Sequence, residues 1–570
     1  MRSSWREFVA VIAGAFAAAI FFTYPMAFRL SHLGRIDSTD GEFSVWNVAW
    51  VSRALVSPSA RVLDANIFQP RTGTLAYSEA NLGAGILGVP FYLVTGNGQA
   101  THNGAVLLGF VLSALAMYLL ARRLTGSWGA AAVSAILFAY CPLVFARTPH
   151  IQLLMIWVLP ACLLALHVFV DRPSWPRAVG LGVSLAVAAI FCAYYGILGG
   201  LIVGLGAIYY GVSRGHWAKW RYWCLLVSAA LLSGALVWPL FRHYRSIQDA
   251  GFARKLEESA SYAADWRAYL ASSSYAHEWM LPLLGHWQEV LFPGFLAIVL
   301  GLAGLVIGLR SRALHEEATP PACPARETAR FYALVAAICA WSSFGPNAGL
   351  YAWLYHVIPV FSFLRAPGRF GIAVSLSLCV LAALAVRALL TRYHRRQAAL
   401  VSGLLVLSIL DLRTASPLRE VPRPDPAYAI LASLPRAQVI ELPYWYRVDD
   451  FMKHSDYMYN STYHWQGLVN GYSDFLPKDF VETVILLASF PNPEGFQLLY
   501  DKRARYAVFH PRNYNNQNRA TLYASLEQWS PYLKLLSRTD DVLLYEITGW
   551  PEFVRKRPPV TQLDGAGASQ

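Results

Sequence analysis

Charged side chains are scarce in this sequence. Only 14% of its 570 residues are Asp, Glu, Lys or Arg, whereas 56% are hydrophobic, and the mean hydropathy is +0.37. A soluble globular domain usually has about 25% charged residues. The composition therefore excludes an ordinary soluble protein and is typical of a polytopic membrane protein.

Acidic and basic residues are absent from the interior of the long apolar stretches. These stretches predict about eleven transmembrane helices, because each has roughly 16 to 24 residues and a helix needs ~20 to cross the hydrocarbon. They are 8–30, 102–121, 128–146, 150–170, 178–194, 197–213, 222–241, 291–309, 330–346, 369–390 and 398–412. Ion-coupled transporters usually keep ionisable groups near the membrane midplane. Their absence favours chemistry at the membrane surface.

Cysteine is also scarce, and its placement excludes an external disulfide. Six of the seven cysteines lie inside predicted spans, and Cys323 lies in a predicted cytoplasmic loop. No cysteine pair has the spacing of a zinc site. The sequence also lacks a Walker A loop, a nucleophile elbow and an HExxH motif. It therefore lacks the motifs that are typical of P-loop NTPases, α/β-hydrolases and zinc metalloproteases.

Basic residues are in excess, and their positions predict the topology. The net charge is +13, and the Lys and Arg clusters fall on one side if the charge-free stretch 178–213 forms two helices. The positive-inside rule then places the N-terminus in the cytoplasm. The loops 31–101, 242–290 and 347–368 and the C-terminal segment lie outside, at the outer face of the cytoplasmic membrane. No nucleic-acid partner is needed to explain the basicity.

An acidic cluster, Asp37-Ser38-Thr39-Asp40-Gly41-Glu42, follows the first span. Thr39 and Glu42 have the spacing of a capping box for a helix over 41–57, and Asp40 would favour the helix dipole. Capping explains at most two of the three acids. A carboxylate at Asp40 could instead accept a proton from an incoming hydroxyl, as a general base does, and both interpretations stay open.

The helix over 41–57 is rich in tryptophan and is expected to lie along the membrane interface. A second short apolar segment, 82–95, is broken by Gly88 and Pro90 and is expected to be interfacial or re-entrant. Glu79, between the two, is either a substrate contact or an exposed loop charge.

Two further outer loops contain cations. The turn Arg147-Thr148-Pro149-His150-Ile151-Gln152 offers groups that bind hydroxyls or phosphate, although a lone interfacial His is often structural. Arg365 and Arg369 flank a Pro-Gly turn, oppose the positive-inside trend and suit a lipid phosphate. Headgroup binding is the alternative.

A metal site receives no support from the sequence. Binding by His150 with Asp37, Asp40 or His102 has no spacing signature. No metal ligand set is therefore predicted, and a divalent metal stays unsupported.

A second domain is predicted after the spans. Four prolines between Pro417 and Pro426 mark a linker, 413–426, after a transmembrane domain of residues 1–412. The sequence that follows predicts a small external α/β domain over 427–554. Its expected strands are 438–442, 505–509 and 542–546, and its expected helices are 477–490 and 518–529. Residues 555–570 are expected to be a disordered tail.

The densest polar and aromatic stretch of this domain contains His464, Trp465 and Asn470. Sugar C–H faces stack on aromatic rings, and sugar hydroxyls need directional hydrogen-bond partners. A carbohydrate site and a hydrogen-bonded domain core use the same residues, so both interpretations stay open.

Together these features resemble the glycosyltransferase C (GT-C) superfamily of integral membrane enzymes. The matching features are Asp37 and Asp40 after the first span, the Trp46–Trp50 helix, Tyr77–Glu79, His150–Gln152, Arg365–Phe370 and the appended external domain. The resemblance implies an all-α polytopic membrane domain with interfacial helices in the first external loop, followed by a small α/β domain outside the membrane.

The resemblance also implies an activity. A sugar would move from a polyprenyl-phosphate-linked donor to a hydroxyl of a glycan, lipid or protein acceptor. Asp40, with Asp37 as second choice, would be the general base, and Arg365 and Arg369 would bind the donor phosphate. The candidate substrate contacts are Glu79, His150, Gln152, His464, Trp465 and Asn470.

One departure from the family concerns the acceptor. The loop lacks the adjacent Asp-Glu pair of the protein O-mannosyltransferases, which argues against a protein acceptor. The alternative functions are a flippase or other transporter of lipid-linked saccharides, and a ligase or polymerase of surface polysaccharide.

Overall fold

The computed structural model describes residues 5–36, 39–249, 255–311, 324–414, 417–445 and 448–555. The chain divides into two compact units, each described here by itself. The bundle unit comprises Met1–Arg35, Asn81–Gly88 and His102–Arg419, and the sheet unit comprises Ile36–Ala80, Val89–Thr101 and Glu420–Gln570. This division differs from the predicted domains, because most of the first external loop packs with the C-terminal segment.

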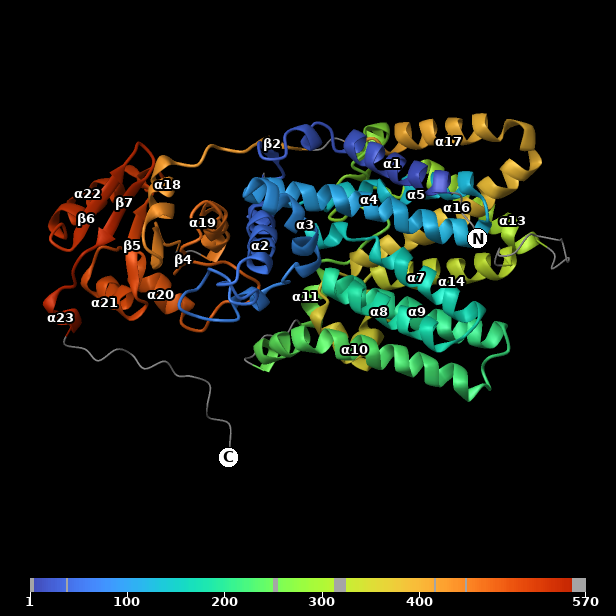
Figure 1. Cartoon of the computed structure of the whole chain (residues 1–570), viewed down its shortest axis with the longest axis horizontal. Helices are drawn as coiled ribbons and strands as arrows, with labels where there is room; N and C mark the ends of the chain where they lie inside the picture. The colour runs from blue at the N-terminus through green and yellow to red at the C-terminus, as the bar shows by residue number, and fades with distance from the viewer. Residues whose placement is uncertain are drawn as a thin grey trace. The chain divides into compact units, whose positions relative to one another are not determined.

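The bundle unit is helical, and its long helices run side by side (Figure 1). Its helices are α1 (Trp5–Phe22), α5 (Trp128–Ala139), α6 (Pro142–Ala146), α7 (Val158–Asp171), α8 (Trp175–Phe191), α9 (Ala193–Ser213), α10 (Trp220–Asp249), α11 (Leu256–Ala260), α12 (Leu281–Leu284), α13 (Phe295–Arg310), α14 (Ala325–Ser343), α15 (Leu350–Val357), α16 (Gly371–Arg392) and α17 (Gln397–Leu412). Two helices, α3 (Leu82–Thr95) and α4 (Gly98–Thr125), run through both units, and the short strands β1 (Leu33–Gly34) and β2 (Arg419–Glu420) complete this part.

Among the described residues, six helices are long and apolar enough to cross a membrane. Each predicted span overlaps a helix. The spans that do not coincide with one of these six helices coincide with helices that are shorter or more polar. Two boundaries differ from the prediction. The span 128–146 is divided at Cys141, and the span 150–170 becomes helical only at Val158 because a 3-10 turn (Ile151–Leu154) precedes it. The stretch 178–213 forms two helices, as predicted, and they meet at Cys192, a few residues before the predicted break between 194 and 197.

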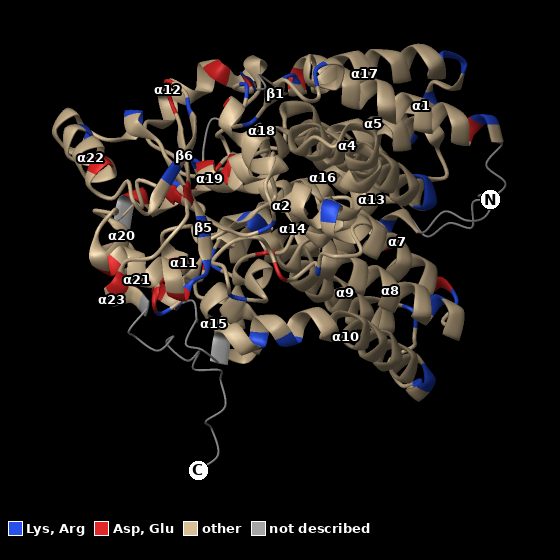
Figure 2. Ribbon diagram, turned by 60° about the vertical axis from the view of Figure 1, so that its left-hand side comes forward, with Lys and Arg blue, Asp and Glu red and all other residues tan. Residues whose placement is uncertain are grey.

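Figure 2 shows that charged residues gather at the ends of the bundle helices. At one end, Arg122 lies 2.7 Å from Glu7, and Arg214 lies 2.7 Å from Asp171 and 2.8 Å from Glu327. These pairs join the C-terminal ends of α4, α7 and α9 to the N-terminal ends of α1 and α14. The predicted cytoplasmic ends of five helices therefore meet at one end of the bundle.

Glycine permits a close contact between α13 and α16 in the bundle unit. On α13, a Cβ added to Gly304 would collide with the Leu381 carbonyl of α16, and one added to Gly301 would lie 3.1 Å from the Leu378 carbonyl. The two backbones approach this closely because neither glycine has a side chain.

The sheet unit is built on a mixed five-stranded sheet with the order β4-β3-β5-β7-β6 (Figure 1). Its strands are β3 (Gln438–Leu442), β4 (Gly467–Leu468), β5 (Ala504–Phe509), β6 (Leu533–Arg538) and β7 (Leu543–Ile547). Strand β3 pairs in parallel with β4 and β5, whereas β7 pairs antiparallel with β5 and β6. Its helices are α2 (Thr39–Val56), α18 (Pro426–Ser433), α19 (His454–Ser461), α20 (Phe480–Leu487), α21 (Pro493–Asp501), α22 (Asn516–Gln528) and α23 (Glu552–Arg555). The predicted α/β character is confirmed. The part of the predicted tail that follows Arg555 is outside the described residues.

Helix α2 is an integral part of the sheet unit. It packs on α19, and Trp46 is 1% exposed and donates a hydrogen bond to Asn66 Oδ1 at 2.9 Å. The chain from Asn66 then pairs with β4 and the segment that follows it, since Leu468 N donates to the Asn66 carbonyl and Phe68 N donates to the Asn470 carbonyl. The predicted helix is present, and its tryptophans, Trp46 and Trp50, are buried in the protein.

Candidate functional site

A cluster of arginines lies at the end of the bundle unit opposite the ion pairs described above. Arg147 follows α6 and forms an ion pair with Glu289, whose side chain is 7% exposed. Burial and then the positive charge of Arg369 lower the pKa of Arg147 to about 10. Two cations therefore lie close together with one buried carboxylate.

Arg365 and Arg369 are positioned by a 3-10 turn (Pro367–Phe370) that leads into α16. Arg365 lies over the Tyr262 ring, at 5.1 Å from its centroid, and 3.7 Å from Glu258. Arg369 lies over the Tyr194 ring at 5.4 Å, and its Nε atom has no hydrogen-bond partner among the described residues. The turn thus presents two guanidinium groups, one of them with an unused donor.

The turn between α6 and α7 brings two predicted contacts to the same end of the bundle. His150 N donates to the Arg147 carbonyl at 2.9 Å, and the His150 carbonyl accepts from Leu153 N at 2.9 Å. Gln152 lies in the 3-10 turn that follows, and both side chains are half-buried. The backbone therefore fixes His150 and Gln152 close to Arg147.

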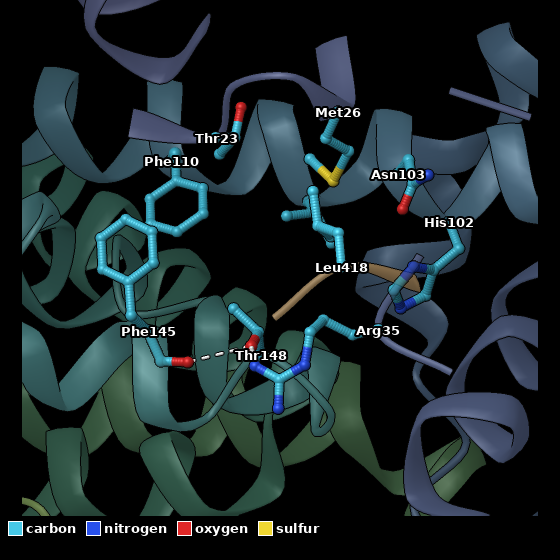
Figure 3. Close-up of a pocket in the computed structure, with 10 residues that line it drawn as sticks. Thr23, Met26, Arg35, His102, Asn103, Phe110, Phe145, Thr148 and Leu418 are labelled. Atoms are coloured by element: carbon cyan, nitrogen blue, oxygen red, sulfur yellow. Dashed lines mark hydrogen bonds between the residues drawn. The ribbon is translucent and has the colours of Figure 1, made fainter. Parts of the chain in front are cut away.

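A small, mostly apolar cavity lies nearby in the bundle unit (Figure 3). Arg35 donates a hydrogen bond to Thr148 on one side of it, and the Phe110 and Phe145 rings stack on another with their centroids 5.2 Å apart. His102 also lines the cavity and is 3% exposed. In the part of the chain that the structure describes, no three His, Cys, Asp or Glu side chains form a group that could hold a metal.

The acidic cluster lies in the sheet unit, at the start of α2. Asp37 is outside the described residues, and Asp40 is half-buried in the first turn. Glu42 Oε2 accepts a hydrogen bond from Ser455 at 3.1 Å. The predicted capping box does not form, because Thr39 is the first helical residue rather than the N-cap and Glu42 binds α19.

Glu42 shares its site with a second carboxyl group. Burial, and then the hydrogen bond and charge repulsion of the neighbouring Asp456, together raise the pKa of Glu42 to about 9. Glu42 therefore carries a proton at neutral pH. Local sequence contains no signal for this pair, because the α19 side chains that meet Glu42 lie more than 400 positions away along the chain.

Glu79 lies in the same unit as α2. Its side chain is half-buried, and its carbonyl accepts a hydrogen bond from Asn47 Nδ2 at 3.2 Å. Asn47 is fully buried on α2. The backbone at Glu79 is therefore fixed to the helix that holds Asp40.

The three predicted sugar contacts of the C-terminal segment have different surroundings. His464 is 3% exposed, stacks on Tyr428 and accepts a hydrogen bond from Gln466 N at Nδ1. Asn470 is fully buried and exchanges two hydrogen bonds with the backbone of Glu441 in β3. Trp465 is half-buried and lines an open groove.

The predicted catalytic and phosphate-binding residues thus fall in different units. Asp40 belongs to the sheet unit, whereas Arg365 and Arg369 belong to the bundle unit. The structure brings His150, Gln152 and Arg369 to one end of the bundle, and it brings Asp40, Glu42 and Glu79 together around α2.

Comparison with known proteins gives matches in structure alone. No protein-family model matches the sequence, and no curated protein matches it. Solved structures that resemble it include ArnT from Cupriavidus metallidurans bound to undecaprenyl phosphate, at 15% identity and a TM-score of 0.47, over 95% of this chain and 97% of that one. The Archaeoglobus fulgidus oligosaccharyltransferase in the apo form is similar at 14% identity and a TM-score of 0.45, over 94% of this chain and 73% of that one. The same archaeal enzyme, AglB, in complex with an inhibitory peptide and a dolichol-phosphate is similar at 13% identity and a TM-score of 0.45, over 97% and 75% of the two chains.

Proposed function

We propose that this protein is a membrane glycosyltransferase that uses a polyprenyl-phosphate-linked sugar at the outer face of the cytoplasmic membrane. The observation that carries the proposal is the pair Arg365 and Arg369 on a Pro-Gly turn. These cations lie at the bundle end opposite the ion pairs of Arg122 and Arg214. A lipid-linked donor keeps its phosphate at the membrane surface, which is where such a pair would bind it.

The proposed orientation rests on the basic helix ends. Arg122, Arg123 and Arg214 meet at one end of the bundle and pair with Glu7, Asp171 and Glu327. The positive-inside rule assigns that end to the cytoplasm. Arg147, Arg365 and Arg369 would then lie on the outer face, together with the donor phosphate.

In the proposed reaction, Asp40 accepts the proton of the acceptor hydroxyl. The acceptor oxygen forms a bond with the anomeric carbon, and the bond from that carbon to the phosphate oxygen breaks. The lipid phosphate leaves with the electron pair, and Arg365 and Arg369 stabilise its charge. A single displacement of this kind inverts the anomeric centre.

The state of Glu42 supports the choice of Asp40 as the base. Glu42 is protonated at neutral pH because its pKa is raised to about 9, so it cannot accept a proton there. Of the described acids in the first turn of α2, Asp40 remains. Asp37 stays the second choice, and Glu79, His150, Gln152, His464, Trp465 and Asn470 stay proposed substrate contacts.

The test uses purified full-length protein and labelled polyprenyl-phosphate sugars, with and without a chelator. Release of lipid phosphate is expected, and Asp40→Asn should lower the rate by about 10²-fold to 10⁴-fold, as the loss of a general base does. Asp540→Asn, an exposed substitution in the same unit, is the control. Thermal unfolding in detergent shows whether each variant is folded.

The same series separates the proposal from its rivals. Wild-type rates in both Asp40→Asn and Asp37→Asn would overturn the base assignment. Transport without transfer predicts no release of lipid phosphate. It also predicts that lipid-linked saccharide accumulates on the inner leaflet of cells that lack the protein.

A further inference from the structure

An open groove in the sheet unit is lined by an unusual number of arginines. It measures about 1220 Å³ including the open solvent at its mouth, and we call it the basic groove. Its charged lining residues are Arg53, Arg61, Asp64, Arg71 and Arg436, and its aromatic lining residues are Trp50 and Trp465. Four cations therefore face one carboxylate.

Most of this positive charge is not neutralised within the protein. Arg71 pairs with Asp479 at 2.6 Å, and Asp64 accepts a hydrogen bond from Gly73 N at 2.8 Å. Among the described residues, no carboxylate pairs with Arg53, Arg61 or Arg436. Three guanidinium groups thus retain donors for an anion.

Two of these arginines repel each other. Burial, together with the charge of nearby Arg436, lowers the pKa of Arg53. Arg53 also lies over the Trp465 ring, at 5.2 Å from its centroid, while Arg436 donates a hydrogen bond to the Trp465 carbonyl. Both cations therefore adjoin Trp465, Arg53 at its indole ring and Arg436 at its backbone carbonyl, and an anionic group between them would relieve their repulsion.

The walls of the basic groove are held in place by buried amides. Gln466 is 1% exposed; its Nε2 donates to the Leu431 carbonyl at 3.1 Å and its Oε1 accepts from Ala437 N at 3.0 Å. Asn66 Nδ2 donates to the Gln466 carbonyl at 3.1 Å. These bonds fix the Trp465 turn to the segment that carries Arg436, so the groove exists before any ligand binds.

Trp465 itself adopts an uncommon backbone conformation. Its φ is +54°, in the left-handed region that bulky residues rarely occupy. The indole is half-buried, and its ring lies 6.0 Å from that of Trp50. A bulky residue kept in a costly backbone conformation at the edge of a groove supports a binding role for its exposed indole face.

We propose that the basic groove binds an acidic saccharide, with its carboxylate or phosphate on Arg53 and Arg436 and a sugar ring against Trp465. Guanidinium groups bind such anions through paired hydrogen bonds, and aromatic rings pack against sugar C–H faces. Gln69 and Gln438 also line the groove and supply amide groups for hydroxyls. Binding here needs no sugar transfer, so the inference stands apart from the proposed function.

The test measures binding to the full-length protein in detergent, without any lipid donor, by ligand-observed NMR titration. The ligands are glucuronate, glucose 1-phosphate, glucose and inorganic phosphate. Glucuronate and glucose 1-phosphate are expected to bind at least about tenfold more tightly than glucose, because glucose lacks the charge that a guanidinium hydrogen-bonds most strongly.

Three variants locate the site. Arg436→Gln should weaken binding of the acidic sugars by about tenfold or more. Trp465→Leu should reduce the preference for glucose 1-phosphate over inorganic phosphate. Arg505→Gln should have no effect, because Arg505 pairs with Glu546 outside the groove. Thermal unfolding confirms that each variant is folded.

Several outcomes would overturn the inference. Equal binding of glucose and glucuronate would remove the role of charge, and unchanged binding in Arg436→Gln would place the ligand elsewhere. Inorganic phosphate binding as tightly as glucose 1-phosphate would indicate a simple anion site. Binding of phosphatidylglycerol nanodiscs that depends on Arg436, without sugar binding, would indicate a lipid headgroup site instead.

Discussion

Arg147, which is half-buried, and the buried Glu289 form an ion pair that joins the turn after α6 to the segment before α13. A third group, Arg369, lies close enough to lower the pKa of Arg147. The ion pair therefore places the guanidinium of Arg147 close to Arg369, whose Nε donor has no hydrogen-bond partner among the described residues. A phosphate at Arg369 would meet a positively charged environment that Glu289 only partly neutralises.

Removing the carboxylate from this pair should destabilise the bundle unit. Glu289→Gln leaves Arg147 buried without its counter-ion, which costs about 3–5 kcal/mol. The melting temperature in detergent should fall clearly. Glu278→Gln, an exposed substitution in the same unit, should leave it unchanged, and an equal effect of both variants would contradict the role assigned to the pair.

The arginines of the Pro-Gly turn should determine affinity for the lipid phosphate. Arg369→Gln is expected to raise the KM for a polyprenyl-phosphate sugar by about tenfold or more, because a charged hydrogen bond is lost. Arg365→Gln should act in the same direction. Arg245→Gln, an exposed substitution at the end of α10, is the matched control.

A partial recovery would refine this result. Arg369→Lys keeps the charge but loses the paired donors of the guanidinium, so its KM should fall between those of wild type and Arg369→Gln. A KM that stays at the wild-type value in Arg369→Gln would remove this residue from the phosphate site.

Periodicity and turn residues predict much of this fold. The apolar runs locate the bundle helices, and the strands around Ile440, Val508 and Leu544 are found because buried strands are short runs of apolar residues. The division at Cys141 and the late start at Val158 are missed, because a run of apolar residues does not show where a helix is interrupted inside it.

Long-range pairing limits what could be predicted for the site. The chain from Asn66 pairs with β4 and the segment after it. The two segments lie some 400 positions apart, and neither contains a sequence pattern that predicts this pairing. The sequence therefore does not predict that α2 packs in the same unit as the C-terminal sheet. The raised pKa of Glu42 is missed for the same reason, since Asp456 is brought to it by the fold.

The glycines of α13 provide a test of helix packing. Gly304→Ala would force a methyl group into the Leu381 carbonyl of α16, so α13 and α16 must separate. Overpacking of this kind costs about 1–3 kcal/mol, and the melting temperature should fall. Gly403→Ala on α17 meets no atom within 4 Å and is the control. Similar melting temperatures for the two variants would contradict the close approach.

Glu42 should make the stability of the sheet unit depend on pH. Its pKa is about 9 in the folded protein against 4.5 for an ordinary Glu, so the folded state holds a proton that the unfolded state releases. The stabilisation is fully present below pH 4.5 and is lost as the pH rises towards 9. Glu42→Gln keeps a neutral side chain at every pH and should flatten this decline, which makes the variant more stable than wild type at pH 8. Glu482→Gln, an exposed carboxylate change in the same unit, should follow wild type. Unfolding free energies measured from pH 5 to pH 9 would contradict the prediction if Glu42→Gln lost as much stability over that range as wild type.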